Sequence, residues 1–209
     1  MTHKPDESFR QRNDQLAEMA EKKYNRTKKL LILLGILVAV IAVIMATVAM
    51  DRYIRYNRAS ELYAAGQYDN AIPRYEELGD YLDSRWKLSE CYVHEAQAKR
   101  AERDWDGALA DFTKAAEINN SLAYNIPNLY MVEGRAKREQ GDWDGAVEAF
   151  MAAGDYQNAA DQVKETRYQQ AASLTEAGDT VGAAEILRLI QGYKDADELL
   201  NGMENMAVE

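Results

Sequence analysis

Residues 141–150 read GDWDGAVEAF, and residues 103–112 read RDWDGALADF, which is nearly the same stretch 38 positions earlier. Sliding the chain against itself extends this match to four units, each marked by one alanine. The separations between these alanines are 37, 38 and 37 positions, and the residues are Ala71, Ala108, Ala146 and Ala183. A period of this length is typical of chains built from repeated supersecondary units.

Each unit repeats one pattern of apolar and small side chains around its alanine. Apolar or aromatic residues follow at four and seven positions, so that all of them share one face of a helix. A chain-reversal position lies five residues before the alanine, and a small residue, as needed where helices cross closely, lies twelve before it. This pattern predicts helix, tight turn, helix in every unit. The four sets are Tyr75, Phe112, Phe150 and Leu187; Leu78, Ala115, Ala153 and Ile190; Gly66, Arg103, Gly141 and Gly178; and Ala59, Ala96, Gly134 and Ala171.

The pattern resembles the tetratricopeptide repeat (TPR), which has a small residue in a first helix, a turn with glycine and an aromatic residue, and an alanine followed by phenylalanine in a second helix. The resemblance covers residues 53–205. It implies an all-α fold: a right-handed α-solenoid of about four TPR-like helical hairpins, with a C-terminal capping helix from Asp195. The first helices depart from the family at Lys99 and Lys137, where an apolar residue is usual.

A second departure concerns the position twelve residues after each repeat alanine, where the family often has proline. This chain has acidic or amide side chains there, and we expect them to cap the next helix by accepting hydrogen bonds from its first amides. The residues are Asp83, Asn120, Asn158 and Asp195.

Residues 30–50 read LLILLGILVAVIAVIMATVAM and carry no charge. At ~1.5 Å per residue such a helix spans roughly 30 Å of hydrocarbon, which predicts a transmembrane helix. A cleaved signal peptide is the alternative, but its apolar core is normally only about 7 to 15 residues long and lies nearer the N-terminus. The predicted organisation is therefore a basic tail (residues 1–29), a transmembrane helix (30–50) and the repeat solenoid (51–209).

The flanks of the apolar segment indicate its direction in the membrane. Basic residues are more numerous before it (Lys22, Lys23, Arg26, Lys28 and Lys29) than after it (Arg52, Arg55 and Arg58). The positive-inside rule therefore favours a cytoplasmic N-terminus with the repeat domain on the outer face of the membrane. The alternative is a cytosolic repeat domain tethered by the same helix. Since no cap or breaker separates Gly35 from Gly66, we expect the membrane helix to continue into the first repeat.

Five small residues lie on one face of the predicted membrane helix, at spacings of 4, 3, 4 and 3 positions: Gly35, Ala39, Ala42, Ala46 and Ala49. Such a stripe lets two helices approach closely, so the segment is compatible with a homodimer. The alternative is that alanine is simply common in membrane segments.

Charge and composition exclude several classes of function. Residues 1–29 carry a net charge of +3 and residues 51–209 a net charge of −13, so we expect no nucleic acid as a partner. The single cysteine, Cys91, and the two histidines, His3 and His94, cannot form a disulfide framework or a zinc site of the usual spacing. Cys91 and His94 lie one helical turn apart without an identifiable third group. The sequence therefore predicts no enzyme, no metal and no cofactor.

What remains is a surface for binding another protein or peptide. The TPR resemblance implies an inner groove lined by first-helix side chains, for which we predict Tyr56, Tyr63, Gln97, Arg100, Met131, Arg135, Arg138 and Tyr168. Three arginines on an acidic body would attract an acidic partner, unless they pair with glutamates of their own helices: Glu95, Glu102, Glu133 and Glu139. The predicted function is a membrane-anchored protein–protein interaction module. The alternative is a structural or accessory subunit of a membrane or envelope assembly that dimerises through the transmembrane helix.

Overall fold

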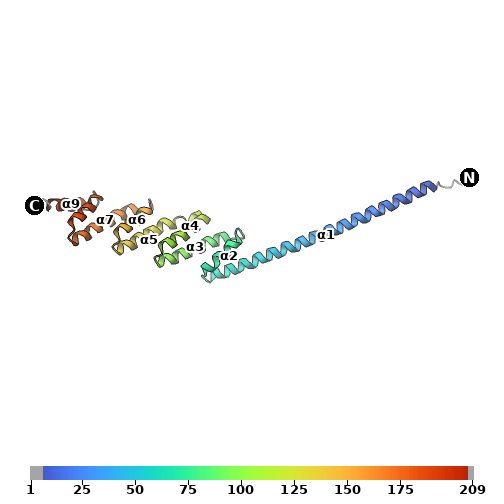
Figure 1. Ribbon diagram of the computed structural model, residues 1–209, viewed down its shortest axis with the longest axis horizontal. Coiled ribbons are helices and arrows are strands. Elements are labelled where there is room, and N and C mark those ends of the chain that lie inside the picture. Colours follow the sequence, from blue (N-terminus) through green and yellow to red (C-terminus); the bar gives the residue numbers. More distant parts are fainter. Residues whose placement is uncertain (1–6, 207–209) are drawn as a thin grey trace. The chain divides into compact units, whose positions relative to one another are not determined.

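The computed structural model describes residues 7–206, and the regular elements in that range are all helices (Figure 1). The first six residues of the predicted basic tail, with His3, and the last three residues of the chain lie outside the described residues. The chain divides into two units, Met1–Arg55 and Tyr56–Glu209. The all-α prediction is confirmed for the described part of the chain.

Helix α1 (Glu7–Ala64) begins in the first unit and ends in the second without a break, as the absence of a cap or breaker predicts. Between residues 30 and 50 its apolar side chains are exposed, for example Leu33 and Ile44. In the described range it is the helix that is long and apolar enough to cross a membrane, with a mean hydropathy of 3.1 in its most apolar window.

In the second unit, helices that follow one another in the chain pack against one another in the same order (Figure 1). The end of α1 contacts α2, and the later helices form the pairs α3 with α4, α5 with α6, and α7 with α8, before α9. A short 3-10 turn, η1, precedes α5. Their bounds are α2 (Tyr68–Leu78), α3 (Ser84–Ala101), α4 (Trp105–Ile118), η1 (Asn120–Leu122), α5 (Asn125–Glu139), α6 (Trp143–Ala152), α7 (Ala159–Glu176), α8 (Thr180–Arg188) and α9 (Ala196–Met206).

The repeated alanines and their apolar followers form the interior of these pairs. All four alanines are fully buried, and the residues four positions later are at most 1% exposed. The apolar residues seven positions later and the small residues twelve positions earlier are buried as well. At Gly134 an added Cβ would lie 2.7 Å from the ring of Phe150, so glycine lets these two helices approach. The predicted packing face is thus confirmed in every pair.

The turn inside each pair has the same backbone geometry. Its central residue has a positive φ in all four cases: 72° at Gly66, 64° at Arg103, 77° at Gly141 and 82° at Gly178. In each turn the next amide bonds back to a carbonyl five residues earlier in the first helix, as from Asp142 to Lys137 at 3.0 Å. Arginine at position 103 therefore adopts a left-handed conformation that glycine adopts at lower energy.

Three of the second helices start with a side-chain cap. The carboxylates of Asp104, Asp142 and Asp179 accept hydrogen bonds of 3.0, 3.1 and 2.8 Å from the amides three residues later. Those amides belong to glycines, and an added Cβ would collide with the capping carboxylate. Glycine at this position therefore serves the cap.

The prediction that the four acidic or amide side chains cap the next helix by accepting hydrogen bonds from its first amides is wrong. Asp83 and Asn158 do precede α3 and α7, but within residues 7–206 neither side chain caps the helix. Asn120 lies in η1, and α5 starts after Tyr124 instead. Asp195 precedes α9, and its carboxylate, like that of Asp83, accepts a hydrogen bond from a tyrosine. The carboxylate of Asp83 is therefore committed to a side chain of the preceding pair.

The buried residues of the described chain form three clusters. The first runs from Ala59 to Leu129, the second from Met131 to Ala159, and the third from Ala171 to Leu200. The first cluster joins the end of α1 with α2 to α5, the first and second clusters both have members on α5, and the second and third both have members on α7. The core of the described residues is therefore divided twice, at α5 and at α7.

Candidate functional site

Two of the predicted groove residues hydrogen-bond the turn that leads to the next pair. Tyr168 Oη donates to Asp195 Oδ1 at 2.7 Å, and Tyr56 Oη donates to Asp83 Oδ1 at 2.5 Å. The first hydrogen bond raises the pKa of Tyr168, because it stabilises the protonated phenol beside a carboxylate. Both hydroxyls are therefore engaged inside the protein, and only the rings remain for a partner.

A lysine lies over the ring of each of these tyrosines. Lys194 Nζ is 4.5 Å from the ring centroid of Tyr168, and Lys87 Nζ is 4.9 Å from that of Tyr56. Lys194 also contacts Glu165 Oε2 at 2.6 Å, whereas Lys87 donates to Tyr56 Oη at 3.0 Å. The repeat period does not relate Lys87 to Lys194, so the sequence comparison missed them.

Tyr63 belongs to an aromatic cluster at the first two pairs. The rings of Tyr68 and His94 are stacked, with centroids 4.2 Å apart and an interplanar angle of 7°, and Tyr63 meets both of them edge to face. Cys91 is fully buried, and burial raises the pKa of its thiol to about 12. Cys91 is therefore a packed thiol, and His94 is stacked on an aromatic ring.

Met131 occupies a different environment from that predicted. It is fully buried in the second core cluster, and Val93, at the same repeat position, is also buried. An unbranched apolar side chain at this position packs inward, whereas the tyrosines at the same position in the first and fourth pairs reach the turn. Met131 is therefore a core residue and not part of a groove surface.

The three predicted arginines differ in how far they are engaged. Arg138 Nη1 donates to Gln162 Oε1 at 2.9 Å, and its guanidinium lies 5.5 Å from the ring centroid of Phe150. Arg135 is exposed and Arg100 is half-buried, as is shown by their accessible surface. Within residues 7–206, no ion pair joins any of the three to a glutamate of its own helix.

The glutamates and lysines of these helices pair differently. Glu133 pairs with Lys137 at 2.8 Å, one turn further along the same helix. Lys99 reaches from α3 to Asp111 in α4 at 2.5 Å, and this hydrogen bond raises the pKa of Lys99. The two lysines that depart from the TPR pattern thus have acidic partners, while Arg100 and Arg135 keep their charges available. The neutral amide of Gln97 is exposed.

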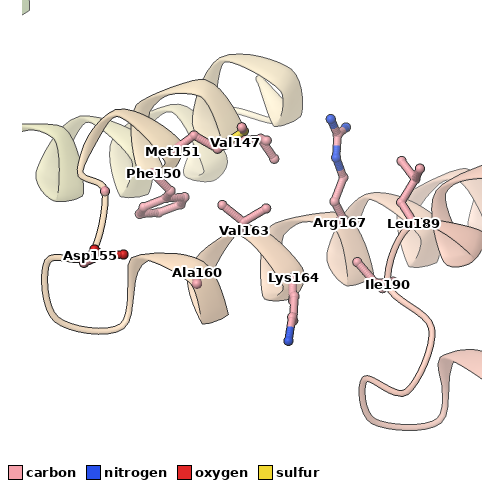
Figure 2. A pocket seen from close by; sticks show the side chains of 11 residues that line it. Val147, Phe150, Met151, Asp155, Ala160, Val163, Lys164, Arg167, Leu189 and Ile190 are labelled. Atoms are coloured by element: carbon pink, nitrogen blue, oxygen red, sulfur yellow. The ribbon is translucent and has the colours of Figure 1, made fainter.

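A cavity of about 540 Å³ lies between α6, α7 and the turn after α8 (Figure 2). Its walls are mostly apolar: Val147, Phe150, Met151, Val163, Leu189 and Ile190. Met151 and Leu189 are each 67% exposed, so they form an open rim.

The polar groups of this cavity are mainly basic. Arg167 and Lys164 both line it, and their side chains leave α7 in opposite directions in this view (Figure 2). Arg167 Nη1 contacts Asp144 Oδ1 at 2.6 Å and Gln170 Oε1 at 2.7 Å. Lys164 is exposed and forms no ion pair with the described residues, and Asp155 is the acidic residue of the lining.

Aligning the four repeat units with one another predicted neither this cavity nor the motif of the turns between pairs. Residues 79–84 read GDYLDS, residues 154–159 read GDYQNA, and residues 192–196 read GYKDA. In each, the glycine and the residue after the tyrosine have positive φ, as at Gly79 (57°) and Leu82 (50°). This second repeated motif was readable in the sequence. The cavity was not, because it depends on how side chains from three elements pack.

Metal binding receives no support from this geometry. Among residues 7–206, no group of three or more His, Cys, Asp or Glu side chains is placed to hold a metal ion.

Neither a comparison with protein-family models nor one with curated proteins finds a match to this chain. The case for a function therefore depends on the residues described above.

Proposed function

We propose that this chain is a membrane-anchored, non-enzymatic module that binds a protein or peptide through a short solenoid of TPR-like hairpins. The observation that carries the proposal is the availability of Arg100 and Arg135, which form no ion pair within the described residues although residues 51–209 carry a net charge of −13. Unpaired cations on an acidic body favour an acidic partner and disfavour partners of like charge.

The proposed groove uses fewer residues than the sequence predicts for it. Gln97, Arg100 and Arg135 supply its polar contacts, and the rings of Tyr56, Tyr63 and Tyr168 supply apolar area. Arg138 contributes less, since Gln162 and Phe150 already hold its guanidinium. Docking of an extended or helical acidic segment across the first helices would use these groups together.

The proposal is tested by photo-crosslinking in native membranes, with a photoreactive amino acid in place of Gln97 of the full chain. We expect a defined adduct that is lost in the double variant Arg100→Ala/Arg135→Ala. A matched control, Arg74→Ala/Arg85→Ala, removes two arginines outside the proposed groove and should leave the adduct unchanged. An adduct of undiminished yield in the first double variant would refute the role of the arginines.

The anchor and its direction form a separate part of the proposal. We propose that residues 30–50 cross the membrane once, with the repeat domain on the outer face, on the strength of the basic flank before the segment. A C-terminal tag should then be degraded by protease as soon as the outer barrier of intact cells is opened. Protection until the inner membrane is broken would assign the repeat domain to the cytosol.

One observation favours the alternative role as a structural subunit that dimerises in the membrane. An apolar depression of about 330 Å³ lies along Ile36, Ala39, Val40, Val43 and Ile44, and it includes Ala39 of the small-residue stripe. Disulfide crosslinking of Ala39→Cys chains that lack Cys91 would detect such a dimer. A crosslink at Ala39 but none at Met45, which lies on another face of the same helix, would support it.

A further inference from the structure

We propose that the cavity between α6 and α7 is a docking pocket for a large apolar side chain within an acidic segment of a partner protein. This inference rests on the proposed function in one respect, that a partner segment is bound. It assigns a site that none of the predicted groove residues lines.

The first support is the gap in the core. Phe150 belongs to the second core cluster and Ile190 to the third, and both line the cavity that lies between them. Its volume of about 540 Å³ is within the range of roughly 300–1,000 Å³ typical of ligand pockets. An aromatic side chain placed here would bury its own surface and cover the exposed apolar rim formed by Met151 and Leu189.

The second support comes from the equivalent positions at two other junctions. Between α2 and α3, Tyr92 Oη donates to Glu76 Oε1 at 2.7 Å. Between α8 and α9, Arg188 Nη2 donates to Glu204 Oε1, also at 2.7 Å. A polar contact thus bridges the two helices at these two junctions, whereas at the α4–α5 junction Thr113 has the position of Glu76 and its hydroxyl donates to Leu109 O in its own helix.

The α6–α7 junction departs from this arrangement. The repeat period puts Met151 where Glu76 and Arg188 stand, and Arg167 where Tyr92 and Glu204 stand. A thioether cannot pair with a guanidinium, and Arg167 turns to Asp144 on the first turn of α6 instead. The bridge seen at the α2–α3 and α8–α9 junctions is therefore missing at the α6–α7 junction, where the larger cavity opens.

The third support is charge. Lys164 has no ion-pair partner among the described residues, and Arg167 is held by Asp144, whose side chain is 75% exposed. An exposed carboxylate is easily replaced, because water screens much of its attraction. A carboxylate of the partner can therefore pair with Lys164 or take the place of Asp144, while an apolar neighbour enters the cavity. A basic segment would meet repulsion from Lys164, the cation of this lining that no described carboxylate neutralises.

The test uses the full chain in nanodiscs of zwitterionic lipid and three fluorescein-labelled peptides of equal length. The first has a central tryptophan and leucine flanked by glutamates. The second has lysines in place of the glutamates, and the third has alanines in place of the tryptophan and leucine. We expect fluorescence anisotropy to show binding of the first peptide, with at least about tenfold weaker binding of the other two.

The decisive variant is Met151→Glu, which supplies a carboxylate at the position of Glu76 and so allows a bridge to Arg167 like those of the α2–α3 and α8–α9 junctions. We expect it to weaken binding of the first peptide at least about tenfold. Thr113→Glu is the matched control, since it adds the same charge at the same repeat position in α4, away from the cavity. Leu189→Glu, at an exposed site on the other side of the cavity, provides a second blocking variant.

Undiminished binding in both Met151→Glu and Leu189→Glu would overturn the proposal, as would equal binding of the glutamate and lysine peptides. A result in which none of the three peptides binds would overturn it as well. The Arg100→Ala/Arg135→Ala chain should bind the first peptide normally. If the double variant keeps its crosslinked membrane partner while Met151→Glu loses the peptide, the proposed groove is refuted and the pocket is supported. If the double variant loses its membrane partner while Met151→Glu still binds the peptide, the pocket is refuted and the groove is supported.

Discussion

Tyr168 in α7 donates a 2.7 Å hydrogen bond to Asp195, 27 positions further along the chain at the start of α9. The same relationship, at the same separation, joins Tyr56 to Asp83 at the other end of the repeats. In both cases a first-helix side chain holds the residue that precedes the next helix. Position and orientation of successive pairs are thus linked by a side-chain contact.

Tyr168→Phe should loosen the attachment of α9. The loss should be less than about 1 kcal/mol, because both partners are accessible to water. Amide exchange in the first turn of α9 should accelerate by up to about fivefold, while exchange in α3 stays unchanged. Tyr124→Phe, which alters an exposed tyrosine, is the control. Equal exchange rates in wild type and Tyr168→Phe would show that the hydrogen bond contributes nothing to stability.

Glu165 should make the C-terminal part of the repeats sensitive to acid. Burial alone would raise its pKa, but hydrogen bonds from Lys194, Tyr193 and Gln169 outweigh it, and the pKa is lowered overall. A group with a lowered folded pKa contributes stability that is present above its unfolded value of about 4.3 and lost as the pH falls through the folded value.

The measurement is the free energy of unfolding of the full chain in detergent, between about pH 3 and 7. Wild type should lose more stability than Glu165→Gln on acidification, because glutamine cannot titrate. Parallel curves for the two chains would contradict the assignment of this acid sensitivity to Glu165.

Arg103 and Gly141 occupy the same turn position with opposite consequences for substitution. Arg103 has a φ of 64°, so Arg103→Gly should relieve strain and stabilise the chain by about 0.5–1 kcal/mol. Gly141 has a φ of 77°, and an added Cβ would meet no described atom within 4 Å, so Gly141→Arg should cost about 1 kcal/mol through the backbone alone. Chemical denaturation of both variants measures the two signs, and a shared sign would rule out backbone strain as the cause.

Ser84→Ala should stabilise the protein. Ser84 is fully buried, and its Oγ has no hydrogen-bond partner among the described residues. In the third and fourth units the equivalent residues are Ala159 and Ala196, both buried, so a methyl group fits this position there. Removing an unsatisfied hydroxyl should add about 1 kcal/mol to the free energy of unfolding. Ser173→Ala, at an exposed helical site, controls for helix propensity; an equal gain in both variants would contradict the explanation.

The packing of the pairs could be predicted from sequence because it depends on positions that recur. Ala71 and its three equivalents, with the apolar residues four positions later, lie in the interior as the helical period requires. Arg103 could be placed in a left-handed turn only because three glycines occupy the same position. In both cases the comparison between units supplied the information that a single unit lacks.

The candidate site was less predictable because side chains at one repeat position make different contacts. Tyr56 and Met131 share a repeat position, yet one bonds to a turn and the other is buried in the core. Asp83 has the chemistry of a cap, but a tyrosine hydroxyl competes for it successfully. The cavity beside Met151 depends on how side chains from α6, α7 and the turn after α8 pack, and sequence periodicity does not reveal which contacts between them fail to form.

The interruption of the core at this cavity has a consequence for how cooperatively the protein unfolds. In a row of units that contact only their neighbours, stability is passed along through the interfaces, and a weak interface divides the row into separately melting parts. The part from α7 to α9 has its own core cluster, so heating should release it before the part that ends with α6. A side chain that fills the cavity would couple the two parts, and a bound partner would make their melting transitions converge.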